Sequence, residues 1–221
     1  MTAPLDAIPA TVLVSERKRV AMDVVCRTLD LAATMTILIL LAPLILVILL
    51  VIKFDSPGPV LFRQQRVGRN QKLFLVTKFR TMQHGADHDV HRHYMLALIE
   101  SGTPAPKLAG DARVTRFGGV LRRTSLDELP QLWNVLRGDM SLVGPRPPIP
   151  YEVAHYPAHW YERFAVKPGL TGLWQDSGRS KVSLERMIEL DVEYVRRRSV
   201  WLNVWILLRT IPAVLTARGA G

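Results

Sequence analysis

The chain has 221 residues, enough for one domain with a hydrophobic core and an accessory segment but too few for two large domains. Its 29 Lys and Arg outweigh 19 Asp and Glu, and the net charge of +10 should attract polyanions. Nucleic acid, anionic lipid headgroups and phosphate-bearing substrates all qualify. The single cysteine, Cys26, excludes an intramolecular disulfide and is interpreted as a small buried hydrophobe.

An apolar run from Leu31 to Ile52 contains no charged residue. As a helix that rises about 1.5 Å per residue, it matches a bilayer hydrocarbon core about 30 Å thick. A polar, basic stretch precedes the run and no small-residue cleavage pattern follows it, which argues against a cleaved signal peptide. We therefore expect a polar basic segment over 1–19, a membrane helix over 20–54 and the remaining domain over 55–221.

Two features favour a membrane helix that returns to the side from which it entered. Cations flank both ends of the run, whereas a spanning helix normally has an uneven distribution. Pro43 removes a backbone hydrogen bond near the middle and should bend the helix at Ala42–Pro43. A kinked helix that crosses the bilayer is the alternative.

The segment after the apolar run predicts a β-hairpin. Runs from Val60 to Val67 and from Lys72 to Thr81 flank the turn residues Gly68–Gln71. Because side chains alternate along a strand, Lys78 and Arg80 should emerge together on one face.

A polar stretch over residues 84–110 predicts a surface loop with a short helix near 91–99. His84, His88 and His91 would share one face of a helix and raise the question of a metal site. Without a cysteine or supporting partners for the rings, the pattern is weak support for zinc, so we interpret it as a solvated loop.

The densest motif runs from Asp111 to Gly138. Ser125, followed three residues later by Glu128, has the pattern of a capping box, and apolar residues continue at helical spacing. We therefore expect a helix that begins near Ser125 and ends at Gly138, with Pro130 tolerated close to its first turn.

Asp127 and Glu128 would then lie in the opening turn, beside free backbone N–H groups that suit an anion. An acidic pair that only favours the helix start is the common alternative. Arginines crowd this part of the chain, and guanidinium groups bind phosphate oxygens in pairs. A carboxylate that attacks phosphorus needs its target's charge neutralised, by cations and usually a divalent metal, so the residue types favour phosphoryl transfer. The arginines are Arg113, Arg116, Arg122, Arg123, Arg137 and Arg146.

The C-terminal part suggests contact with a bilayer surface. Residues 151–166 mix aromatic side chains with His and Arg, a mixture that ordinary core aromatics explain equally well. Residues 184–195 have the pattern of an amphipathic helix. Arg196–Arg198 precede an apolar stretch over 200–208 that is too short to span, and we interpret that stretch as an interfacial helix at headgroup depth.

Three ordered motifs resemble those of the bacterial sugar transferases called monotopic phosphoglycosyl transferases, which prime exopolysaccharide, O-antigen and glycoprotein glycan assembly. The motifs are Lys78–Met82, Arg122–Pro147 and Lys167–Gln175, and the resemblance covers about residues 20 to 216. With it we expect an α+β, predominantly helical fold: a re-entrant membrane helix, a small β-hairpin and interfacial amphipathic helices around the active site. The site would lie at the cytoplasmic face of the bacterial inner (plasma) membrane.

The resemblance implies an enzyme of the undecaprenyl-phosphate sugar phosphotransferase class. A carboxylate corresponding to Asp127 attacks the sugar-bearing phosphate of a UDP-sugar, releases UMP and forms a phosphosugar-aspartyl intermediate. Undecaprenyl phosphate then attacks this intermediate to give the lipid diphosphosugar. Two displacements at one site predict ping-pong kinetics. Similarity at Trp174–Gln175 and Leu207–Leu215 favours glucose or galactose as the hexose.

The resemblance also implies roles for single residues. Asp127 and Glu128 form the catalytic pair with Mg²⁺, or Mn²⁺ as the alternative, and Glu128 either binds the metal or orients the incoming group. The predicted phosphate- and substrate-binding residues are Lys78, Arg80, Arg122, Arg146, Gln175 and Arg179. Asp191 matches an acidic position whose role stays open.

One departure concerns the membrane bend. Many family members carry Ser before the proline, whereas this chain has Ala42, so a hydroxyl that could hold the broken backbone is missing.

The expected partners are UDP-sugar, undecaprenyl phosphate, membrane lipids and downstream glycosyltransferases, with no nucleic acid. A membrane-tethered nucleic-acid-binding protein is disfavoured because the cations gather around carboxylates that would repel a nucleic-acid backbone. An inactive scaffold is disfavoured by the intact Asp127–Glu128 pair. A hydrolase of phosphate esters is the third alternative, and dependence of UMP release on lipid phosphate would distinguish it from a transferase.

Overall fold

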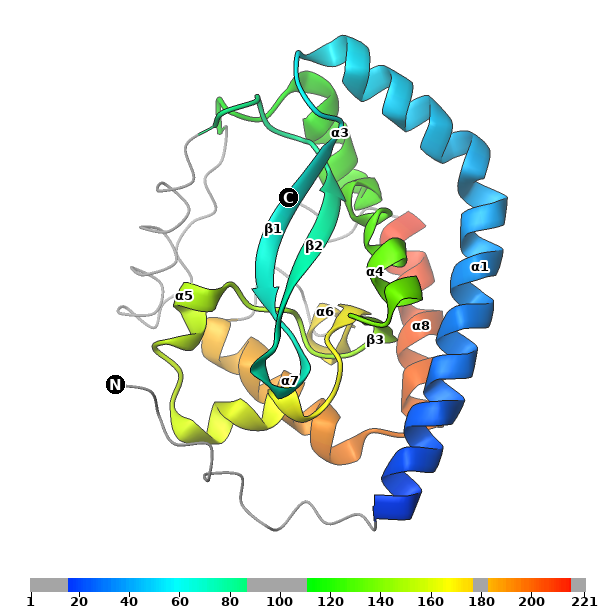
Figure 1. Ribbon diagram of the computed structural model, residues 1–221, viewed down its shortest axis with the longest axis vertical. Coiled ribbons are helices and arrows are strands. Elements are labelled where there is room, and N and C mark those ends of the chain that lie inside the picture. The colour runs from blue at the N-terminus through cyan, green and yellow to red at the C-terminus, as the bar shows by residue number, and fades with distance from the viewer. Residues whose placement is uncertain (1–15, 87–110, 177–182, 216–221) are drawn as a thin grey trace.

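The computed structural model describes residues 16–86, 111–176 and 183–215, and this part of the chain is mostly helical, as expected (Figure 1). The α-helices are α1 (Glu16–Asp55), α3 (Arg116–Thr124), α4 (Gln131–Arg137), α5 (Pro150–Val153), α6 (Leu173–Asp176), α7 (Leu184–Arg197) and α8 (Val200–Leu215). The strands are β1 (Leu61–Val67), β2 (Leu73–Phe79), β3 (Ser141–Val143) and β4 (Gly169–Thr171). Short 3₁₀ helices are η1 (Arg69–Gln71), η2 (Leu126–Glu128) and η3 (Ala158–Ala165).

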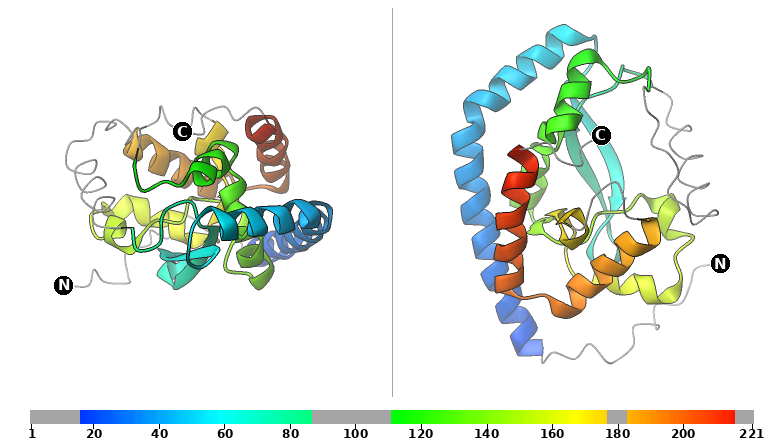
Figure 2. Two further views of the ribbon diagram at one scale, coloured as in Figure 1. Left: turned by 90° about the horizontal axis from the view of Figure 1, so that it is seen from above. Right: turned by 180° about the vertical axis from the view of Figure 1, so that it is seen from behind.

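Helix α1 extends along one side of the molecule, next to α8 (Figures 1 and 2). It is one helix of 40 residues that contains Pro43, and its direction changes in its second half (Figure 1). Over Val20–Asp55 it is long and apolar enough to cross a membrane, and only 11% of its most apolar window is buried. An exposed apolar surface of this kind fits membrane association.

Polar contacts attach the N-terminal half of α1 to the rest of the protein. Arg27 donates hydrogen bonds to the carbonyl oxygens of Val135 and Leu136 at the end of α4. Asp30 is buried and accepts a hydrogen bond of 2.7 Å from the Ser141 hydroxyl of β3. Because buried polar groups are costly without partners, these bonds favour one position of α1 on the domain.

The predicted hairpin is confirmed. β1 and β2 pair antiparallel from Leu61 opposite Phe79 to Val67 opposite Leu73. A second, parallel pair between β3 and β4 was not expected. There the backbones approach so closely that a Cβ added to Gly169 would lie 2.0 Å from the Gly144 nitrogen. This close approach explains why position 169 of the Lys167–Gln175 motif is glycine.

Two apolar clusters hold the helices around the hairpin. The larger cluster joins β2, α4, β3, α7 and α8, and the smaller one joins the second half of α1 to the hairpin and α3. The larger consists of Val76, Leu132, Val135, Met140, Leu142, Val143, Tyr194, Val195 and Ile206, and the smaller of Ile48, Ile52, Phe79 and Leu121. The segment from α3 to α4 therefore packs between α1 and β2.

The C-terminal part is helical as expected. The amphipathic pattern over 184–195 becomes α7, whose Ile188 packs in a third cluster with Tyr156 and Phe164. These aromatic side chains are buried, so for them the core interpretation of residues 151–166 is correct. Helix α8 leaves apolar side chains such as Trp201 (75% exposed) at the surface.

Candidate active site

The chain turns sharply between α3 and α4, and the expected capping box is wrong. Ser125 has φ 58, in the left-handed region, and its side chain makes no capping hydrogen bond. It ends α3, with its backbone N–H bonded to the carbonyls of Leu121 and Arg122. The expected end of the helix at Gly138 is confirmed by its left-handed φ of 88.

Asp127 and Glu128 therefore lie in the 3₁₀ helix η2 instead of the first turn of an α-helix, which begins only at Gln131. The Glu128 N–H already donates to the Ser125 carbonyl, at 3.2 Å. A three-residue helix has little macrodipole and few free donors. The backbone of η2 thus cannot supply the predicted anion site, and nearby side chains must.

Lys78 is the side chain that reaches the acidic pair. Its Nζ lies 2.6 Å from Glu128 Oε1 and joins β2 to η2, with the two side chains 27% and 32% exposed. The structure thus brings Lys78 to the Asp127–Glu128 pair, and its contact with phosphate stays a prediction. The ion pair also orients Glu128.

Asp127 has an altered acidity. Burial raises the pKa of Asp127 to about 6, the positive charge of Lys78 opposes that rise, and the Glu128 carboxylate adds to it. Arg122 also opposes the rise, which places its charge near the pair. The Arg122 side chain is exposed, and its Nε donates to the Thr81 hydroxyl at 2.9 Å. A carboxyl group with a pKa near 6 is mostly ionised at neutral pH and can act as a nucleophile.

Arg80 does not join this group. Its guanidinium is buried and donates to the Ser56 and Pro57 carbonyl oxygens at 2.6 Å and 3.0 Å. The expectation that Lys78 and Arg80 emerge together is therefore wrong, because β2 ends at Phe79 and Arg80 binds the chain that follows α1. These bonds give Arg80 a structural role in place of the predicted phosphate contact.

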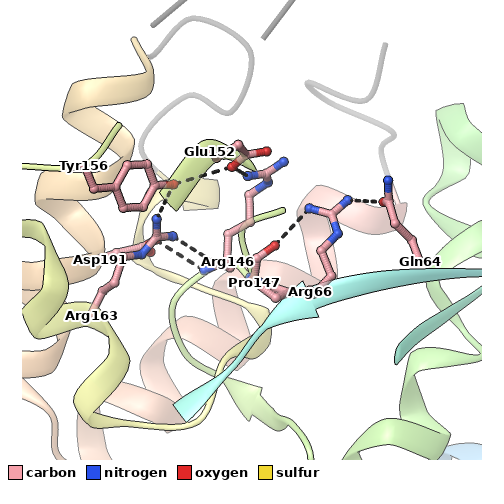
Figure 3. Close-up of polar contacts among 8 residues, drawn as sticks. All are labelled: Gln64, Arg66, Arg146, Pro147, Glu152, Tyr156, Arg163 and Asp191. Carbon is pink, nitrogen blue, oxygen red and sulfur yellow. Dashed lines mark hydrogen bonds and ion pairs between the residues drawn. The ribbon is translucent and has the colours of Figure 1, made fainter. Parts of the chain in front are cut away.

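Arg146 belongs to a buried ionic cluster (Figure 3). Its guanidinium donates to Glu152 at 3.1 Å, and Arg163 pairs with Asp191. Burial raises the pKa of Asp191 to about 6, although Arg163 lowers it. Arg146 and Asp191 can be singled out from the sequence, whereas Glu152 and Arg163 cannot, because only the folded chain brings these four residues together.

The second predicted substrate loop is partly described. Gln175 Oε1 accepts a hydrogen bond of 2.8 Å from the Gly172 N–H and so closes its own turn. Arg179 lies outside the described residues, as do His88 and His91 of the histidine cluster.

The acidic pair offers a minimal metal site. Within the described residues no group of three or more His, Cys, Asp or Glu side chains gathers to hold an ion. Mg²⁺ is commonly bound by one or two carboxylates together with substrate phosphates. Asp127 and Glu128 fit that donor set, with the remaining ligands to come from substrate and water.

Known proteins resemble this chain over most of its length. A family model described as "Bacterial sugar transferase" matches residues 21–217. "Exopolysaccharide production protein ExoY" of Rhizobium meliloti is 40% identical over 196 residues, which cover 88% of this chain and 87% of that protein. "UDP-glucose:undecaprenyl-phosphate glucose-1-phosphate transferase" of Caulobacter vibrioides is 43% identical over 231 residues, covering 98% of this chain and 81% of that protein. "Undecaprenyl-phosphate galactose phosphotransferase" of Salmonella typhimurium is 39% identical, and the match covers 88% of this chain and 41% of that protein.

Proposed function

The chain belongs to the bacterial sugar transferase family, and from that membership we propose that it transfers a hexose-1-phosphate from a UDP-sugar to undecaprenyl phosphate and releases UMP. Relatives named for glucose-1-phosphate and galactose phosphate transfer support a UDP-hexose as the donor. The family relationship supports a role at the first membrane step of exopolysaccharide, O-antigen or glycoconjugate assembly, where downstream glycosyltransferases would use the product.

The observation that carries this proposal is the placement of Asp127 beside the Lys78–Glu128 ion pair. In the first displacement an Asp127 oxygen forms a bond to the sugar-bearing phosphorus, and the bond to the UMP oxygen breaks. In the second, an oxygen of the lipid phosphate attacks the same phosphorus and Asp127 leaves as a carboxylate. One nucleophile thus serves both half-reactions.

The neighbouring charges have separate tasks in this reaction. Lys78 and Arg122 offset the negative charge of the approaching phosphates, which otherwise repel the Asp127 carboxylate. Lys78 also orients Glu128 through their ion pair. In this arrangement the carboxylates of Asp127 and Glu128 would together hold Mg²⁺. When bound, Mg²⁺ would neutralise phosphate charge and help to stabilise the leaving UMP.

The packing of η2 explains how a lipid phosphate could reach the nucleophile. Leu126 and Leu129 flank the acidic pair and pack against the cluster that contains Ile48 and Ile52 of α1. The same half of α1 exposes apolar side chains such as Leu46 and Leu50. From this packing we propose that the site lies at headgroup depth. From the family resemblance we further propose that it faces the cytoplasm at the inner membrane, with α1 re-entrant and bent near Ala42–Pro43.

The test measures multiple-turnover UMP release by the protein in nanodiscs, with Mg²⁺, undecaprenyl phosphate and a panel of UDP-sugars. The wild type and Glu185→Gln, which changes an exposed carboxylate on α7, should release UMP from one UDP-hexose, whereas Asp127→Asn should not. Full activity of Asp127→Asn would refute the nucleophile assignment. Sustained UMP release without the lipid phosphate would indicate hydrolysis instead of transfer.

A further inference from the structure

Arg66, a residue with no assigned role, lies next to the rigid turn that carries Arg146 (Figure 3). Its guanidinium donates to the Pro147 carbonyl oxygen at 2.9 Å and to Gln64 Oε1 at 2.6 Å. The neighbouring Val67 N–H donates to the Pro148 carbonyl oxygen at 2.9 Å. Strand β1 and this turn are thus joined twice, by a side chain and by the backbone, and Arg66 is held beside Arg146.

The backbone of Arg146 is held from two sides. Its N–H donates to Asp191 at 3.3 Å, and its carbonyl oxygen accepts from Arg163 at 2.7 Å. Because Arg163 and Asp191 also pair with each other, one buried ion pair restrains both backbone polar groups of Arg146. The Arg146 side chain remains 25% exposed, so part of it can be reached from the surface.

The cluster contains more positive than negative charge. Three arginines, Arg66, Arg146 and Arg163, face two carboxylates, Glu152 and Asp191 (Figure 3). Glu152 is buried, and Arg146 and Arg66 both help to keep its pKa below the usual value despite that burial. The carboxylate is therefore ionised at neutral pH, and it offsets only one of the two neighbouring cations.

The two guanidinium groups retain hydrogen-bonding capacity. Within the described residues, the buried Nε of Arg66 has no hydrogen-bond partner. Among residues 16–86, 111–176 and 183–215, the Arg146 side chain donates one hydrogen bond, to Glu152. Burial and the neighbouring charge of Arg146 lower the pKa of Arg66 to about 10, although Glu152 and Glu128 oppose them. Arg66 thus stays charged at neutral pH, and it lies on the same face of the hairpin as Lys78, because Arg66 is opposite Phe74 and Lys78 is opposite Phe62.

A cluster with a purely structural role should have no net charge or should have all its polar groups paired. This cluster has neither property. Arg66 adds a positive charge that no carboxylate offsets, and it lies beside the partly exposed side chain of Arg146. Two such arginines are a favourable site for an anion with several oxygens. From these observations we propose that Arg66 and Arg146 form a clamp for the phosphate oxygens of a substrate. This inference rests on the proposed function, which supplies two such substrates: the diphosphate of the UDP-sugar and the phosphate of the lipid acceptor.

The test uses binding, so that it does not depend on turnover. Dissociation constants for UDP and for a short-chain polyprenyl phosphate are measured in nanodiscs for the wild type, Arg66→Gln, Arg66→Lys and Arg63→Gln. Arg63 is the matched control, because it is an exposed arginine of the same strand. The melting temperature without ligand is recorded for each variant.

Loss of a charge-assisted contact should weaken binding of one probe about 10- to 100-fold in Arg66→Gln. Arg66→Lys keeps the charge but loses the planar pair of donors, so its binding should be weakened by a smaller factor. Arg63→Gln should bind both probes like the wild type. Weaker binding of UDP assigns the clamp to the donor, and weaker binding of the lipid phosphate assigns it to the acceptor.

Unchanged affinity for both probes in folded Arg66→Gln would overturn the clamp. If Arg66→Gln does not fold, unchanged affinity in Arg66→Lys has the same meaning, since a structural role would lower the melting temperature without changing affinity. A wild type that binds UDP but releases no UMP would refute the proposed function and leave the clamp standing.

Discussion

Asp127→Asn should have two effects: it should abolish transfer, and it should make the folded protein more stable. Folding raises the pKa of Asp127 from 3.8 to about 6, so the folded protein binds its proton more tightly than the unfolded chain does. Stability is then lost as the pH rises from 3.8 through about 6. At about 1.36 kcal/mol for each pKa unit, the ionised carboxylate costs the folded state about 3 kcal/mol at neutral pH. The neutral amide removes this cost.

The measurement is the unfolding free energy in nanodiscs at pH 7.5 and at pH 4.5, without substrate or Mg²⁺. At pH 7.5 Asp127→Asn should exceed the wild type by up to about 3 kcal/mol, a value that already includes the attraction of Lys78 and Arg122 for the carboxylate. At pH 4.5 the advantage should shrink. Glu185→Gln should show no such difference. The burial argument would be refuted if Asp127→Asn were less stable than the wild type at pH 7.5. It would also be refuted if the difference in unfolding free energy between variant and wild type were the same at both pH values.

Three further predictions concern the pH profile, the ion pair and the β3–β4 contact. Because Asp127 must be ionised to attack, kcat/KM for the UDP-sugar should fall about tenfold from pH 7 to pH 5, with an apparent pKa near 6 in the UMP assay. Lys78→Met should shift that acid limb to higher pH, because Lys78 lowers the pKa of Asp127, and a profile that does not move would contradict their coupling. Gly169→Ala should not yield folded protein, judged by a cooperative melting transition, because its Cβ would lie 2.0 Å from the Gly144 nitrogen. Gly119→Ala, where an added Cβ meets nothing within 4 Å, is its matched control and should fold.

Features encoded within a short stretch of chain could be predicted from the sequence. The hairpin follows from two β-forming runs around a turn, and α7 from its amphipathic period. The same local reasoning failed at Ser125, where the pattern of a capping box is present but a left-handed φ of 58 ends one helix before the next begins. Serine rarely adopts this conformation, so propensity alone favours the helix start that the structure lacks.

Contacts between distant segments could not be predicted in this way. The sequence marks Arg66 only as one of the cations that flank the membrane helix, whereas Arg146 is predicted to bind phosphate beside the acidic pair. Their proximity depends on the docking of β1 against the turn at Pro147, which no local pattern contains. Arg80 shows the same limit, because strand alternation predicts a direction for its side chain but not the carbonyl groups that bind it.

The left-handed turn at Ser125 changes which groups can supply positive charge near Asp127. A helix N-terminus would have offered the phosphate a set of backbone donors that no side-chain substitution removes. In η2, the compensating charge comes from Lys78 and Arg122, which approach from β2 and α3. Because burial raises the pKa of Asp127, its altered pKa requires the hairpin to be packed against η2. The same fold packs Leu126 and Leu129 of this turn against α1. The packing of α1 on the domain and the pKa of Asp127 therefore both depend on the contacts of η2 and its flanking leucines.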